Sequence, residues 1–525
     1  MVSHLLGRRN GSVFASELFG CPVGERRVPA QAMDVRLKRW SFTVLPLKQA
    51  IERCPPKIAH WLGREYLAHA NRAIMERARS TLVTRLVFCL FTATLVLCVA
   101  CIVLLHGGSA TAQTTLSREL ILQQVDGGPS YYGKFTNGLP TEPSYFPIGL
   151  WLEAIPAGQA DIDRDKDAGI NLYVGIADPE NANLALLRSN AMYAIIQENE
   201  RTRFSGIGSE TVGWVVGDEV DMAHGPSRGY EHLINTLTKL PNDLRLRYSN
   251  YGKGVMFWQT DQEAQRFVNE FQQVVSNDMY WFTDPHACRG RSRVQSVLNK
   301  LFNRPAALPD RVCRLAANYG STVERMRLLD GMDGRRMPIW NFVEVGWPFT
   351  ETAAQGGRMI VPGEVRAAVW HSLIAGARGI VYFNHSFGGP CPSHHALREP
   401  CYTNVRATVK SVNEQIKALA SVLNSPTVSS HFLVSASVKA MMKWDGNNFY
   451  VFAGSARNEA STSSFSLSCI GSAAAVVIGE DRTIPVIGGT WEDSFPNGNA
   501  IHIYRIEGGS KCALPNNIDV GTVPF

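Results

Sequence analysis

Eight short apolar runs, separated by amphipathic segments, constrain the fold of this 525-residue chain more than any other feature. The runs are 146–153, 171–177, 191–198, 212–219, 244–250, 277–283, 337–344 and 378–384. Such alternation is typical of repeated strand–helix units and a parallel sheet. Eight units in about 240 residues predict a closed (β/α)8 barrel over residues 144–425. An open doubly wound sheet is the competing architecture, but no glycine-rich phosphate turn follows the first run.

The segments between the runs carry helix signals. Apolar residues recur at helical spacing, and glycine or proline marks several ends. The expected helices include 161–169, 229–240, 261–275 and 362–379. Local patterns therefore agree with the barrel that the eight runs predict.

A second region begins near residue 426. Two alternating runs joined by Asp445, Gly446 and Asn447 predict a β-hairpin, and more short strands follow. Residues 426–525 should therefore form a small antiparallel β-sandwich. Residues 106–143, which contain several glycines and prolines, are expected to be a linker or a cap on the barrel.

The N-terminal part has the features of an export or anchoring signal. Residues 86–105 are twenty uncharged, mostly apolar residues that follow a basic region, 1–85. A small-x-small pattern ending at Ala112 fits cleavage by a signal peptidase. A start at Met75 would make the segment a cleaved signal peptide, whereas a start at Met1 favours a single-pass anchor. Either way the C-terminal part is expected outside the cytoplasm; a buried soluble helix is the alternative.

The charge balance argues against nucleic-acid binding as the function of this chain. Residues 1–85 hold 15 of the 52 Lys and Arg and 6 of the 46 Asp and Glu, which leaves 37 against 40 beyond them. A near-neutral folded region lacks the electrostatic footprint of a nucleic-acid binder. Membrane contact is expected only through the N-terminal apolar segment.

Six cysteines follow the apolar segment, an even number that suits an oxidising compartment. Proximity along the chain favours three disulfides, with free buried thiols as the alternative. The favoured pairs are Cys288 with Cys313, Cys391 with Cys401, and Cys469 with Cys512. No Cys/His cluster indicates a zinc site.

Two glutamates stand where barrel enzymes place their chemistry, at the C-terminal ends of strands. Glu219 ends the fourth run, "VGWVVGDE", and Glu344 ends the seventh, "MPIWNFVE". Ends of the fourth and seventh strands face each other across a barrel mouth. A carboxylate at a helix N-terminus is the alternative reading of Glu219.

With these two positions the chain resembles the retaining glycoside hydrolases of clan A, many of which append a β-sandwich to the barrel. The resemblance covers roughly residues 144–525 and implies that Glu219 is the acid/base and Glu344 the nucleophile. Retention requires one protonated and one ionised carboxyl about 5 Å apart. Asp218 stands where most of the clan has an asparagine that binds the sugar 2-hydroxyl. The mechanism needs neither a metal nor an organic cofactor.

Further candidates for contact with a carbohydrate lie near strand ends. Aromatic rings stack on the apolar faces of sugars, and polar side chains bind hydroxyls. In clan A a tyrosine after the sixth strand often hydrogen-bonds to the nucleophile, and the resemblance therefore implicates Tyr280. The other candidates are Trp151, Trp281, Trp340, Trp347, Glu153, Glu198, Asn250 and His385. Trp214 and Trp370 are expected to pack in the core.

Other functions compete with hydrolysis. A non-catalytic carbohydrate-binding protein could use the same barrel, and a tethered scaffold could use the β-sandwich for contacts. The pair of strand-end glutamates favours the enzyme over both. A serine hydrolase is set aside because the chain has no G-x-S-x-G elbow.

Overall fold

The computed structural model describes residues 120–154, 158–177, 183–198, 206–288, 310–508 and Cys512. All of them belong to one compact unit, Thr115–Phe525. The basic region, the apolar segment 86–105 and the cleavage pattern at Ala112 lie outside these residues. Within the described ranges, no helix is long and apolar enough to cross a membrane.

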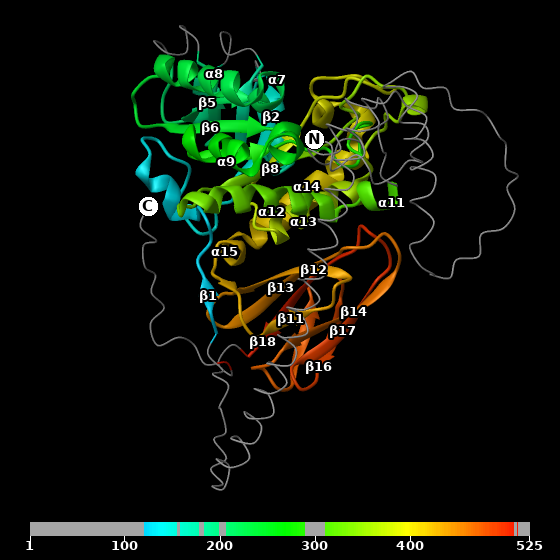
Figure 1. Ribbon diagram of the computed structural model, residues 1–525. Coiled ribbons are helices and arrows are strands. Elements are labelled where there is room, and N and C mark those ends of the chain that lie inside the picture. Colours follow the sequence, from blue (N-terminus) through cyan, green and yellow to red (C-terminus); the bar gives the residue numbers. More distant parts are fainter. Residues whose placement is uncertain are drawn as a thin grey trace, which may run out of the picture. The chain divides into compact units, whose positions relative to one another are not determined.

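Eight parallel strands close into a barrel in chain order, as the sequence predicts (Figure 1). They are β2 (Ile148–Glu153), β3 (Leu172–Ile176), β4 (Tyr193–Ile196), β5 (Thr211–Asp218), β6 (Leu246–Tyr251), β7 (Val274–Asn277), β8 (Ile339–Glu344) and β9 (Gly379–Phe383). The first and last strands pair through Ile148 and Ile380, which closes the ring. Almost every strand residue is buried, which explains why the runs are continuously apolar.

The sixth strand is the exception to the prediction. Of the expected run 277–283, only Asn277 belongs to the strand, which is Val274–Asn277, and the rest is a loop. Helix α9 (Asp261–Glu270) accordingly stops five residues before the end of the expected segment 261–275. Val274 and Val275 continue the apolar spacing of that helix, so the sequence pattern hides the change from helix to strand.

Helices of the expected kind follow the strands. They are α4 (Gln159–Asp167), α5 (Leu184–Ser189), α7 (Val220–Ala223), α8 (Gly225–Lys239), α9, α11 (Asp310–Cys313), α12 (Ala317–Asp330), α13 (Pro362–Ile374), α14 (Thr403–Ala418) and α15 (Ala420–Leu423). Thr260 and Glu263 form a reciprocal capping box at the start of α9. Pro362 occupies the first turn of α13, where its missing N–H costs nothing.

The segment before the barrel closes the N-terminal end of the barrel and also joins the sandwich. The 3-10 helix η1 (Pro129–Lys134) places the buried Tyr131 and Tyr132 in the inner barrel core. The Tyr131 hydroxyl donates to the carbonyl of Gln273, just before β7, and the Trp340 indole donates to Tyr132. Strand β1 (Leu122–Gln123) pairs with β10 (Thr427–Val428). The described part of 106–143 is therefore both a cap and a strand.

The C-terminal region forms two antiparallel sheets over their own core, as predicted. One sheet has the order β1-β10-β12-β13-β18-β15-β16 and the other β11-β14-β17. The strands are β11 (Phe432–Val434), β12 (Val438–Trp444), β13 (Asn448–Ser455), β14 (Ser461–Leu467), β15 (Ala473–Val477), β16 (Arg482–Val486), β17 (Thr490–Phe495) and β18 (Ile501–Glu507). The predicted hairpin turn joins β12 to β13, with Gly446 at a positive φ of 105°.

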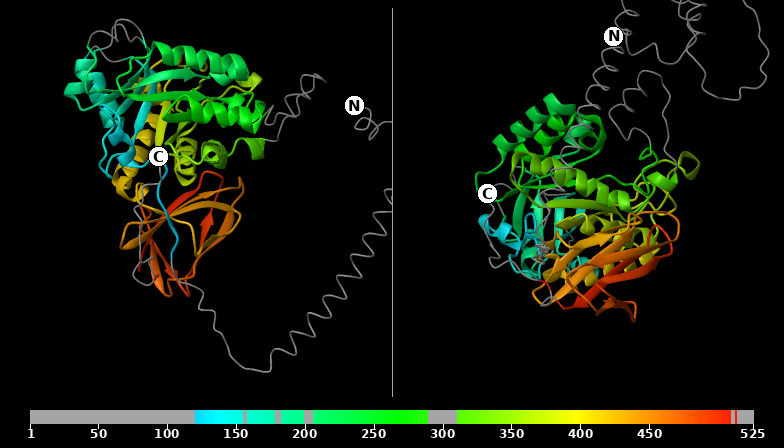
Figure 2. Two further views of the ribbon diagram at one scale, coloured as in Figure 1. Left: turned by 60° about the vertical axis from the view of Figure 1, so that its left-hand side comes forward. Right: turned by 60° about the horizontal axis from the view of Figure 1, so that its bottom comes forward.

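Helix α13 joins the two cores. Its sequence is apolar on every side because it packs on β8 of the barrel and on β12 and β13 of the sandwich. Trp370 of this helix stacks on Phe452 of β13, with ring centroids 5.6 Å apart. Figures 1 and 2 show α13 between the barrel strands and the sandwich sheets. Trp370 and Trp214 are both fully buried, as expected for packing residues.

Candidate active site

Glu219 occupies the first position after β5 in a left-handed backbone conformation, with φ of 47° and ψ of 26°. A side chain other than glycine, asparagine or aspartate takes this conformation rarely, and such strain collects at functional sites. The Glu219 N–H donates to the carbonyl of Asn250 on β6 at 3.0 Å. This bond fixes the turn that carries the half-buried Glu219 side chain out of the strand.

Asp218 is held by a line of side chains across three strands. Its carboxylate accepts from the Asn250 side-chain amide at 3.0 Å, and Asn250 accepts from the Ser276 hydroxyl at 2.8 Å. Tyr248 completes the line with a hydroxyl contact to Ser276. The Asp218 side chain stays exposed, yet the surrounding protein atoms, and then the Glu219 charge, raise its pKa to about 6. Asn250 is buried behind it.

Asp221, the third acid of the same stretch, is structural. Its buried carboxylate accepts from the backbone N–H groups of Gly252 and Val255, at 3.2 and 2.8 Å. Burial raises its pKa to about 7, against the effect of these donors. Asp221 therefore anchors the loop after β6 rather than facing the barrel mouth.

Asp278 brings a further carboxyl to Glu219, and the sequence analysis did not select it. It follows β7, and its N–H donates to the carbonyl of Tyr251 at 3.1 Å. Glu219 and Asp278 are thus tied to consecutive residues at the end of β6, and their side chains hydrogen-bond to each other. Burial, then the Glu219 charge and this bond, raise the pKa of Asp278 well above its usual range. The proton that this raised pKa retains on Asp278 allows its carboxyl to donate the hydrogen bond to Glu219.

Glu344, the last residue of β8, is fully buried and held by two hydroxyl groups. Tyr319 donates to its carboxylate, with 2.8 Å to each oxygen, and Thr283 donates to Oε1 at 2.8 Å. Burial raises the pKa of Glu344 to about 7, and the hydroxyl donors oppose that rise. Both donors favour the ionised form, which is the form able to attack.

The buried Tyr280 hydroxyl is affected by the charges of four of these acids. Tyr280 is 6% exposed, and its hydroxyl has no hydrogen-bond partner among the described residues. Burial, then the charges of Asp278, Glu219, Glu344 and Asp218 in that order, raise its pKa well above its usual range. The charges of both strand-end glutamates therefore act on this one buried hydroxyl, in keeping with the parallel order β5-β6-β7-β8 that places these strand ends at the same side of the barrel.

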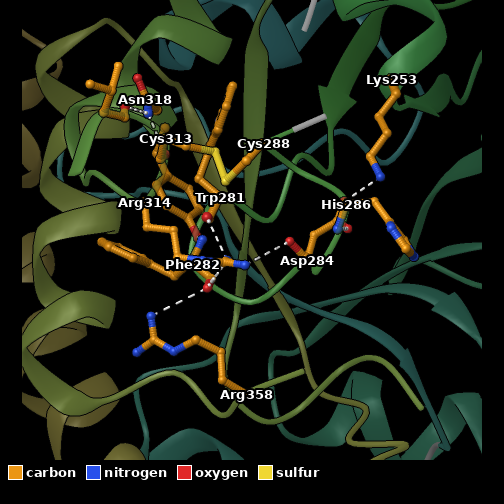
Figure 3. Close-up of a disulfide and its surroundings, with 12 residues drawn as sticks. Lys253, Trp281, Phe282, Asp284, His286, Cys288, Cys313, Arg314, Asn318 and Arg358 are labelled. Carbon is orange, nitrogen blue, oxygen red and sulfur yellow. Dashed lines mark hydrogen bonds and ion pairs between the residues drawn. A yellow bond between two sulfur atoms is a disulfide. The ribbon is translucent and has the colours of Figure 1, made fainter. Parts of the chain in front are cut away.

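The loop after β7 carries Thr283, and it is braced by a disulfide and by Arg314 (Figure 3). The Cys288–Cys313 disulfide ties its end to α11, and Arg314 donates to the carbonyls of Phe282 and Asp284. Tyr319 also accepts the Phe282 N–H at 3.1 Å. These contacts fix the backbone on either side of Thr283 and so set the position of its hydroxyl.

The other two predicted disulfides, Cys391–Cys401 and Cys469–Cys512, are also formed. The first lies in the segment after β9, and the second joins Cys512 to Cys469 within the sandwich core. Within the described ranges, no group of three or more His, Cys, Asp or Glu could hold a metal ion.

Several predicted sugar contacts are core residues instead. Trp340 is fully buried, and Trp281 is 1% exposed and donates to Thr322 at 2.9 Å. Trp151 is 4% exposed and packs on Tyr248 and Phe342 inside the barrel. None of these three indoles presents a face to a ligand, so their prediction as sugar contacts was wrong: a tryptophan near a strand end cannot be told from a core tryptophan by sequence position.

Glu153 is a second correction. It is fully buried at the end of β2, and its two carboxylate oxygens contact Asn384, His395 and Arg398. Arg398 also pairs with Asp165 at 2.6 Å. The carboxylate is therefore occupied by protein side chains and cannot bind a sugar hydroxyl.

Three candidates keep positions compatible with a ligand. Trp347 is half-buried after β8, with its indole bonded to the carbonyl of Glu351, and Glu198 is half-buried after β4. His385 follows β9, contacts the Leu152 carbonyl at 3.1 Å, and lies in a group of rings with Phe387 and His394. Burial lowers the pKa of His385, so this ring is neutral near pH 7.

Comparison with known proteins identifies no family. No family model matches, and no curated protein matches. Among solved structures, the chain is similar to a glycoside hydrolase at 10% identity and TM-score 0.44, covering 75% of this chain and 98% of the other. A glycoside hydrolase of family 5 from Bacteroides vulgatus gives 13% and 0.44, covering 74% and 97%. AbfB, a family 51 α-L-arabinofuranosidase from Bifidobacterium longum, gives 10% and 0.40, covering 76% and 100%.

Three important side chains were not predicted, because the sequence pattern misplaces the sixth strand and gives no signal for a residue that reaches the site from a helix. Tyr319 lies inside helix α12, and Thr283 and Asp278 lie in the loop that was taken for the sixth strand. Only a correct end for β7 would have drawn attention to Asp278. Nothing in the sequence indicates that a tyrosine in the first turn of α12 reaches the end of β8.

Proposed function

We propose that this chain is a retaining glycoside hydrolase that acts on a poly- or oligosaccharide. The observation that carries the proposal is Glu344, buried at the end of β8 and held by two hydroxyl donors, with Glu219 at the end of β5 and the charges of both acids acting on the buried Tyr280 hydroxyl. Double displacement requires one ionised and one protonated carboxyl. The two hydroxyl donors support the ionised form of Glu344, and Asp278, whose pKa is raised, lies in hydrogen-bond contact with Glu219.

In this proposal Glu344 attacks the anomeric carbon while Glu219 protonates the departing oxygen. The bond from the anomeric carbon to the leaving oxygen breaks as the bond to Glu344 forms. Glu219, now ionised, then takes a proton from water, whose oxygen displaces Glu344 and releases the sugar. Asp278 acts through Glu219, because the hydrogen bond between them keeps a proton at this pair between turnovers.

Asp218 fits a role in binding the sugar hydroxyl nearest the reaction. The Asn250 amide donates to one of its oxygens, which holds the exposed carboxyl in one orientation. With a pKa of about 6, Asp218 is protonated in mildly acidic conditions and can then donate a hydrogen bond as an asparagine would. Trp347 and His385 are proposed as further contacts.

Export is also part of the proposal, supported by the three disulfides, which persist in oxidising compartments. The apolar segment 86–105 would then act as a signal or as an anchor.

The test is hydrolysis of a panel of aryl glycosides and polysaccharides by the purified protein. Glu344→Gln should abolish turnover, and Glu219→Gln should spare substrates with good leaving groups far more than those with poor ones. Glu351→Gln, which changes an acid in the loop after β8 that contacts His286, is the matched control. Full activity in Glu344→Gln would refute the mechanism. Binding to a glycan array without turnover would favour a carbohydrate-binding protein.

A further inference from the structure

A cavity of about 170 Å³ lies at the opposite end of the barrel from the carboxylates. It is lined by β1 and the segment after it, by α12, by the end of α13 and the turn from it to β9, by the end of α15, and by strands β10, β11 and β12 of the sandwich. Its charged lining residues are Asp126, Arg327, Arg378 and Lys443. The cavity therefore brings three cations and one carboxylate together between the barrel and the sandwich.

Lys443 of β12 is 2% exposed and lacks an acidic partner. Its ammonium donates to the Ser425 carbonyl at 3.0 Å and to the Thr427 hydroxyl at 2.9 Å, both uncharged oxygens. Among the described residues, no carboxylate lies within ion-pair distance of it. Burial, and then the nearby charges of Arg378 and Arg327, lower its pKa well below the usual value. Lysine is almost never buried in this way without a counter-charge.

Arg378 likewise has no acidic partner among the described residues. It is 6% exposed, and its guanidinium donates to the Leu423 carbonyl at 2.9 Å and to the Asn424 side chain. Its buried Nε has no partner, and no carboxylate in the described part of the chain pairs with it. Phe146 covers one side of the guanidinium.

The single acid of the cavity is already engaged. Asp126 accepts from Arg327 through both Nε and Nη2, at 3.0 and 2.7 Å. This pair is neutral as a whole, so Arg378 and Lys443 remain as two buried cations with no anion. Removing such charges from water is costly unless an opposite charge and hydrogen bonds compensate them.

We propose that this cavity binds a small oxyanion, such as phosphate, sulfate or a ligand carboxylate. Lys443 and Arg378 supply the charge. The Thr427 hydroxyl, whose oxygen accepts from Lys443, keeps its own proton to donate to the anion. Arg378 belongs to the base of the barrel, whereas Lys443 and Thr427 belong to the sandwich. The anion thus links the two regions and is independent of the glutamates and of the proposed hydrolase activity.

The test is calorimetric titration of the full chain with inorganic phosphate and with sulfate, at constant ionic strength maintained with sodium chloride. Lys443→Met keeps the length and the apolar stem of the side chain, and it should weaken phosphate binding at least tenfold, since a hydrogen bond to a charged group is lost. Lys439→Met is the matched control: Lys439 lies on the same strand, is half exposed and pairs with Glu324, so binding should not change.

Thermal unfolding gives a second readout. Phosphate should raise the Tm of the unchanged protein and of Lys439→Met in a concentration-dependent way, with little effect on Lys443→Met. The proposal is overturned if the unchanged protein binds neither anion at constant ionic strength, or if both variants bind equally. It is also overturned if Lys443→Met raises the Tm equally with and without phosphate, because that would mark an uncompensated charge in an empty cavity.

Discussion

The hydroxyl of Tyr319 should set the pH at which Glu344 becomes reactive. It contacts both carboxylate oxygens at 2.8 Å, and the pKa of Glu344 is about 7 with this donor in place. A hydrogen bond to a charged group contributes about 1.5–3 kcal/mol. One pKa unit corresponds to about 1.4 kcal/mol, so Tyr319→Phe should raise the pKa of Glu344 by roughly 1–2 units.

The consequence is measured as the pH dependence of kcat/KM on an aryl glycoside, which reports groups of the free enzyme. The acidic limb should move up by roughly 1–2 pH units, so that at pH 6 the variant is roughly 10- to 100-fold slower than the unchanged protein and the ratio shrinks as the pH rises. Tyr382→Phe removes a buried hydroxyl from the next strand, where it donates to Asn413, and should leave the limb in place. A ratio for Tyr319→Phe that does not vary with pH would refute the reasoning.

Three further changes test the same site. Glu344→Gln should raise the Tm more at pH 8 than at pH 5, as calorimetry at both pH values can check. Between about pH 4.5 and 7 the Glu344 carboxyl keeps its proton in the folded state but loses it in the unfolded state. The stability of the unchanged protein therefore falls as the pH rises through that window, and glutamine removes this loss. Asp278→Asn should move the basic limb of kcat/KM to lower pH and slow poor leaving groups most, because an amide cannot share a proton with Glu219; pH profiles on two aryl glycosides measure this. Replacing Cys288 and Cys313 by serine should lower the free energy of unfolding by about 3 kcal/mol, measured in urea, and should also lower kcat.

Each of these results has a contrary outcome. An equal Tm difference at both pH values would mean that Glu344 is not protonated in the folded protein at neutral pH. An unchanged pH profile in Asp278→Asn would show that Asp278 does not affect the protonation of Glu219. Serine substitution of the sandwich disulfide, Cys469–Cys512, should lower stability alone; an equal loss of kcat there would show that the activity loss follows general destabilisation.

Much of the fold could be predicted from the sequence because barrel strands are buried on both faces and therefore appear as continuous apolar runs. The same property caused the error at β7. Its valines continue the spacing of α9, while the loop that follows is as apolar as a strand because Met279, Trp281 and Phe282 are buried there. Strand β1 was missed because it has only two residues, and only the partner β10 defines it as a strand.

The two glutamates could be found because the end of a strand fixes where a side chain lies in a barrel. Their partners could not, because Tyr319 reaches Glu344 from a helix and Asp278 reaches Glu219 across β6. Aromatic residues were the least predictable of all. Trp340 and Trp347 lie only seven residues apart, yet the first stands at the start of β8 and is sealed in the core, whereas the second is half-buried beyond the end of the strand.

The most direct test of the central claim is to look for a covalent sugar on Glu344. The purified protein would be incubated with 2-deoxy-2-fluoro aryl glycosides whose parent sugars it hydrolyses, and its peptides would be mapped by mass spectrometry. The account predicts one glycosyl adduct per chain on the peptide that contains Glu344, and none in Glu344→Gln. Turnover of the parent glycosides with no adduct, or an adduct on another residue, would contradict it.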